Sequence, residues 1–89
     1  MTPFQILDVV KKYDEILENK WVAASKINDD CKDITDSEML MHVRWMCQQI
    51  PNLIELDKME KVNRWIGFIQ GVLWSQKIFS ILEMKEHNS

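Results

Sequence analysis

The segment from Lys58 to Ser75, KMEKVNRWIGFIQGVLWS, decides the fold of this 89-residue chain. Its apolar side chains recur at spacings of three and four residues, the period of an α-helix, and the core-facing set is Met59, Val62, Ile66, Ile69 and Leu73. Other apolar residues flank this stripe on both sides, and Phe68 lies opposite its centre. A helix that is apolar on most faces is typical of one packed among several neighbours. The segment therefore predicts a helix that packs against neighbouring elements on several of its sides.

A second helix is predicted just before it, over about 36–56. Thr35 and Glu38 have the spacing of a capping box, in which each side chain satisfies a free backbone amide at the helix start. The apolar stripe that follows is Met39, Leu40, Val43, Met46, Cys47 and Ile50. Pro51 removes a backbone donor and is expected to end or kink the helix. Because only a short turn near Asp57 separates the two helices, they should form an antiparallel hairpin.

Two further helices are predicted at the ends of the chain. Thr2 and Pro3 favour a helix start, and the apolar stripe predicts a helix over about 3–18, with a possible extension through Trp21 to Ile27. The polar, acidic residues 28–33 should form a loop. Ser80 and Glu83 repeat the capping-box spacing and predict a short C-terminal helix, with residues 86–89 frayed.

Composition agrees with one all-α domain over residues 1–89, a small helical bundle built on the hairpin of about 36–56 and 58–75. Two glycines and two prolines leave little material for the tight turns of a β-protein.

The net charge of −3 argues against non-specific binding to nucleic acid or anionic membranes. The longest uncharged stretch, Trp65–Gln76, is much shorter than a membrane span, and no signal peptide is evident. A cytosolic location is expected.

No catalytic motif, metal-ligand set or cofactor-binding loop is recognisable, so the sequence predicts a non-enzymatic protein without a metal or cofactor. Cys31 and Cys47 lack the spacing of a zinc site, and we expect reduced thiols. Cys47 falls on an apolar stripe and should act as a small hydrophobe. His42 has no nucleophile or carboxylate partner at a defined spacing, which favours a structural or surface role.

Both glycines, Gly67 and Gly71, lie four residues apart inside the predicted third helix, where each costs about 1 kcal/mol relative to alanine. Close packing of another backbone against them would offset this cost. One interpretation is a homo-oligomer interface formed by Gly67, Phe68, Gly71 and Trp74. The other is that the glycines only make room for bulky side chains within the chain's own core.

Candidate binding residues lie on both helices of the hairpin. Arg44-Trp45 and Arg64-Trp65 are similar pairs, and an arginine beside an indole is a common binding anchor. Lys58 and Lys61 extend Arg64 into a basic edge, which either holds a phosphate or pairs with nearby carboxylates of Glu55, Asp57, Glu60 or the first helix. Met41 and Trp45 point away from the core stripe. They form a contact site, or the N-terminal helix or the Trp21 segment covers them.

Three runs within about residues 36–88 carry a family signal: His42-x-x-Trp45-Met46-Cys47; Lys61-x-x-Arg64-Trp65-Ile66-Gly67-Phe68-Ile69-Gln70-Gly71-Val72-Leu73-Trp74; and Ile78-Phe79-Ser80-Ile81 with Glu83. Through these runs the chain resembles a group of small accessory proteins, not parts of the virion, that tailed bacteriophages encode. The resemblance implies a phage origin and action in the cytoplasm of an infected bacterium, and it supplies no catalytic residues.

Three functions fit these observations. The first is inhibition or modulation of a host protein, in host takeover or counter-defence, because tryptophan and methionine give adaptable contact surfaces. The second is a sponge that sequesters a cyclic or other small nucleotide signal at a subunit interface. The residues that would bind the nucleotide are Arg44, Trp45, Arg64 and Trp65. The third is a purely structural homo-oligomer.

Overall fold

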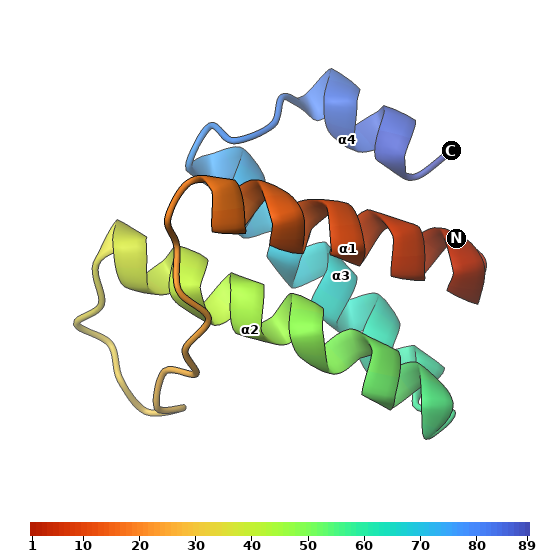
Figure 1. Cartoon of the computed structure of the whole chain (residues 1–89), viewed down its shortest axis with the longest axis horizontal. Helices are drawn as coiled ribbons and strands as arrows, with labels where there is room; N and C mark the ends of the chain where they lie inside the picture. The colour runs from red at the N-terminus through yellow and green to blue at the C-terminus, as the bar shows by residue number, and fades with distance from the viewer.

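A computed structural model describes all residues from 1 to 89 and contains four helices and no strand. The helices are α1 (Pro3–Asn19), α2 (Asp36–Glu55), α3 (Met59–Ser75) and α4 (Ile81–His87). Figure 1 shows that each helix runs back in the opposite direction to the one before it. The contacts of α2 with both α1 and α3 make it the central helix. The predicted all-α class, the small bundle and the α2–α3 hairpin are confirmed.

Local sequence signals begin three of the helices as predicted. At α2, the Thr35 hydroxyl accepts the Glu38 N–H at 3.1 Å, and the Glu38 carboxylate accepts the Thr35 N–H at 3.0 Å. Ser80 and Glu83 make the same reciprocal pair at α4. Thr2 also caps α1 in this way, with a glutamine as its partner. Each box satisfies amides that have no partner within the helix.

The core lies between α1, α2 and α3 and contains fifteen buried residues, all of them apolar or aromatic. Apart from Leu53, which follows Pro51 in α2, they come from the predicted stripes and from the C-terminal segment: Ile6, Val10, Tyr13, Leu17, Val43, Met46, Cys47, Ile50, Leu53, Val62, Ile66, Ile69, Leu73, Phe79 and Met84. Burial raises the pKa of the Cys47 thiol to about 12, so this cysteine behaves as the small hydrophobe that the sequence predicts. None of the four helices is long and apolar enough to cross a lipid bilayer.

The C-terminal segment packs more firmly than the sequence suggests. Phe79 packs against Tyr13 with 5.4 Å between ring centroids, and His87 Nδ1 lies 2.7 Å from the Tyr13 hydroxyl oxygen. The prediction that fraying begins at residue 86 is wrong, because these contacts hold the last turn of α4 against α1.

The helix α1 ends at Asn19, so its predicted extension to Ile27 is wrong. Trp21 adopts a left-handed backbone with φ of 64°, which turns the chain out of the helix. Residues 22–28, hereafter the crossover segment, then pass across α2 (Figure 1). Pro51 lies inside α2 and does not end it, since the helix continues to Glu55.

Candidate functional site

The two Arg-Trp pairs are brought together only through their tryptophans. The Trp45 and Trp65 rings lie 5.8 Å apart between centroids across the α2–α3 contact. Arg44 points the other way, toward α1. Its guanidinium donates to Asp14 at 2.8 Å, and to Glu18 at 2.9 Å. It also donates to the Val22 carbonyl at 2.8 Å. Through these contacts Arg44 joins α2 to α1 and to the start of the crossover segment. Of the two arginines, only Arg64 is exposed.

The crossover segment covers the face of α2 that carries Met41 and Trp45. The Ser25 N–H donates to the Met41 carbonyl at 3.1 Å, and the Lys26 ammonium lies 5.9 Å from the centroid of the Trp45 ring. Both α2 side chains are half-buried. Of the two interpretations of this face, coverage by the segment around Trp21 therefore describes the structure.

His42 holds the crossover segment in place. Its Nδ1 accepts the Ile27 N–H at 3.0 Å, so the neutral ring carries its proton on Nε2. Burial lowers the pKa of His42, as does the charge of Lys26, while Asp29 acts in the opposite direction. The structural role that the sequence favours for His42 agrees with this contact.

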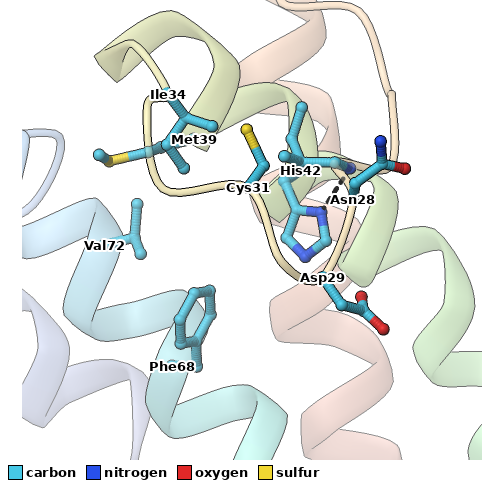
Figure 2. A pocket seen from close by; sticks show the side chains of 9 residues that line it. Asn28, Asp29, Cys31, Ile34, Met39, His42, Phe68 and Val72 are labelled. Atoms are coloured by element: carbon cyan, nitrogen blue, oxygen red, sulfur yellow. Dashed lines mark hydrogen bonds between the residues drawn. The ribbon is translucent and has the colours of Figure 1, made fainter.

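A pocket of about 460 Å³ opens where the loop after the crossover segment faces α2 and α3 (Figure 2). We call it the seam pocket. In Figure 2, Phe68 and Val72 approach it from α3, opposite Cys31 and Met39. The full lining is Ile27, Asn28, Asp29, Cys31, Ile34, Met39, His42, Phe68 and Val72. It is mostly apolar and open to solvent along one side.

The seam pocket continues as a groove along α2 and α3. A second hollow of about 350 Å³ shares His42 and Phe68 with it and is completed by Met46, Arg64 and Trp65. We call the two hollows together the α2–α3 groove. A third, smaller hollow of about 280 Å³ shares Arg64 and also contains Lys58 and Lys61, with Asp57 and Glu60 beside them. Apolar surface and basic side chains therefore follow each other along one line.

The basic edge of Lys58, Lys61 and Arg64 makes no ion pair within 4 Å, and the prediction that it pairs with nearby carboxylates is wrong. Two acidic groups of α1 that were among the expected partners, Asp14 and Glu18, bind Arg44 instead. Lys61 lies over the Trp65 ring, with Nζ 5.3 Å from the centroid. Its positive charge is thus held beside the groove and remains available to an anion.

The outward side of α3 carries both glycines in open space. A Cβ atom added at Gly67 or Gly71 would meet nothing within 4 Å. Close packing of these glycines within the chain is therefore excluded, as is the interpretation that they make room for bulky core side chains. Phe68 and Trp74 beside them are 54% and 51% exposed. We call Gly67, Phe68, Gly71 and Trp74 the glycine face.

The helix ends make the position of these glycines more unusual. Each of the first three helices is followed, two positions after its last residue, by a left-handed residue. These residues are Trp21, Asp57 and Lys77, with φ of 64°, 57° and 64°. Such ends favour glycine, because a side chain there is strained. The chain has only two glycines and places both where they weaken a helix.

The Trp21 side chain is 95% exposed. Sequence reasoning missed this feature because the end of α1 was uncertain.

No three histidine, cysteine, aspartate or glutamate residues lie close enough together to hold a metal ion. Comparisons with family models, with curated proteins and with solved structures found no match to this chain. The resemblance to phage accessory proteins therefore stays a prediction, and function has to be argued from the surfaces described above.

Proposed function

We propose that this chain is a non-enzymatic accessory protein of a tailed phage that binds a host protein in the bacterial cytoplasm and inhibits or modulates it. The observation that supports this proposal is the glycine face. Two exposed glycines and two half-exposed aromatic side chains form an apolar strip on α3. Such a strip lets a partner helix approach closely, and each glycine costs about 1 kcal/mol of helix stability. No close contact within the chain offsets that cost.

The host partner is tested by capturing crosslinked proteins from infected cells with tagged chain. Gly71→Ala is the informative variant, because the added methyl group meets nothing in the chain but obstructs close approach of a partner. Glu15→Ala, an exposed substitution on α1, is the matched control. We expect the wild type and the control to capture the same host protein and Gly71→Ala to lose it. Equal capture by all three would contradict a role for the glycine face, and no reproducible host protein would contradict the function.

We propose in addition that the chain associates with itself, since the same face suits a second copy. Light scattering at micromolar concentration is expected to give a multiple of the 10.6 kDa chain mass. A monomeric mass at that concentration would exclude self-association. If the chain associates but captures neither a host protein nor a nucleotide, the purely structural oligomer becomes the preferred function.

A sponge for a small nucleotide is the alternative, favoured by one observation. Arg64 and Trp65 line the same hollow, and Lys61 is held over the Trp65 ring without a carboxylate partner. An unpaired cation beside an aromatic face suits a phosphate next to a base. A panel of defence nucleotides should then raise the melting temperature, and Arg64→Ala should remove the rise. No shift with any nucleotide would rule the sponge out.

A further inference from the structure

We propose that the α2–α3 groove binds a protein segment that carries a bulky apolar side chain followed, a few residues away, by an acidic one. The apolar side chain occupies the seam pocket, and the carboxylate meets Arg64 and Lys61. This site goes beyond the proposed function, because it is a different surface from the glycine face and shares only Phe68 with it. It stands whether or not the glycine face meets a host protein.

The seam pocket suits an apolar anchor because six of its nine lining residues are apolar and two of its polar groups are already engaged. The Nδ1 atom of His42 accepts the Ile27 N–H, and the Asp29 carboxylate lies 3.7 Å from the Lys26 ammonium. The remaining lining is mainly aliphatic, aromatic and sulfur-containing. A volume of about 460 Å³ lies within the usual range for ligand pockets.

Charge gives the groove a direction. Arg64 is the one charged residue of the second hollow, and Lys61 follows it along the same side of α3. The other end of the groove borders residues 26–33, in which three aspartates outnumber two lysines. An acidic residue of the partner is therefore attracted to Arg64 and repelled by the loop, which orients the bound segment.

The length and openness of the groove favour a polypeptide over a small molecule. Val72 and Lys61 are eleven residues apart on α3, which is about 16 Å at 1.5 Å per residue. About five residues of extended chain span that distance. The groove is open along one side, so a small ligand would remain half in water. A protein partner covers the open side with its own surface.

The test is selection of a random 12-residue peptide library on the intact chain. Enriched peptides are expected to combine a leucine, phenylalanine or tryptophan with an aspartate or glutamate at a fixed separation. Fluorescence anisotropy then measures a labelled, enriched peptide against variants. Arg64→Glu should weaken binding at least about tenfold, and raising the salt concentration should weaken binding to the wild type. Lys85→Glu on α4 makes the same change of net charge away from the groove and should leave the affinity unchanged.

A second pair of variants separates this site from the glycine face. Phe68→Ala should weaken peptide binding because Phe68 lines both hollows, whereas Trp74→Ala should not, since Trp74 lines neither. The inference is overturned if no peptide is enriched, if enriched peptides lack acidic residues, or if Arg64→Glu behaves like Lys85→Glu. Displacement of the peptide by an equal concentration of AMP would assign the groove to nucleotides and also overturn it.

Discussion

Replacing Gly67 or Gly71 with alanine is expected to stabilise the isolated chain by about 1 kcal/mol each, because alanine favours a helix more than glycine does. The new methyl group meets nothing within 4 Å, so no steric cost opposes the gain. Urea unfolding at a protein concentration low enough to keep the chain dissociated measures the effect. A loss of stability under those conditions would show that the outward side of α3 is tighter than the structure has it.

Trp21→Gly is expected to raise the free energy of unfolding by about 0.5–1 kcal/mol, since glycine relieves the strain of a left-handed residue. Little contact is lost, because the Trp21 side chain is 95% exposed. Lys20→Gly is the control. It lies one residue earlier with φ of −91° and should lose about 0.5–1 kcal/mol. If both variants lose stability equally, Trp21 makes a contact that stabilises the fold.

At the scale of helices, Arg44 joins α1, α2 and the start of the crossover segment. Arg44→Ala is expected to cost about 1–3 kcal/mol, because three charge-assisted hydrogen bonds are lost from a mostly buried side chain. Arg64→Ala, in the otherwise similar Arg-Trp pair, should change stability by no more than about 0.5 kcal/mol, since Arg64 is exposed and unpaired. Thermal and urea unfolding of the two variants compare them directly. Equal losses would contradict this division of roles.

The Arg-Trp pairs also show where sequence reasoning stops at this scale. Spacing placed Trp45 and Trp65 on antiparallel helices, and their rings do meet. It did not show that Arg44, one residue from Trp45, faces α1. Adjacent residues on a helix point about 100° apart. Which neighbour Arg44 meets is therefore determined only by where α1 packs against α2.

For the molecule as a whole, two histidines tie separate parts together and make stability depend on pH. His42 anchors the crossover segment. His87 anchors α4 at Tyr13. Burial lowers the pKa of both; Lys26 adds to this at His42, and Lys12 adds to it at His87, against the opposing effects of Asp29 and of Glu83 and Glu86. Each ring therefore takes up a proton more readily in the unfolded chain, where its pKa is about 6.5.

Stability linked to these groups is complete above the unfolded pKa and is lost as pH falls through the lower, folded values. We expect the free energy of unfolding to decrease from pH 7.5 to pH 5.5. The lowered pKa of Glu83 has the same sign but acts at more acidic pH, below its ordinary value of 4.5. Urea unfolding of a His42→Gln, His87→Gln double variant should show a flatter profile over this range. An unchanged slope would show that other groups carry the dependence.

The sequence by itself determined the helices, their capping boxes and the apolar stripes that form the core. These features depend on side-chain period and on hydrogen bonds between residues three or four apart, so they are visible in a single chain. The antiparallel order of α2 and α3 followed from the short turn between them. The capping boxes at Thr35 and Ser80 began helices at the predicted residues.

Only the tertiary structure decided which surfaces stay open. The crossover segment covers Trp45, and Arg44 forms hydrogen bonds with side chains of α1. Both glycines face outward with no neighbour. The basic edge likewise makes no ion pair, and two carboxylates of α1 that were among its expected partners bind Arg44. Each outcome depends on contacts between residues far apart in the chain, and those distances are set by how α1 and the crossover segment pack on α2. Helical period alone contains no information about that packing.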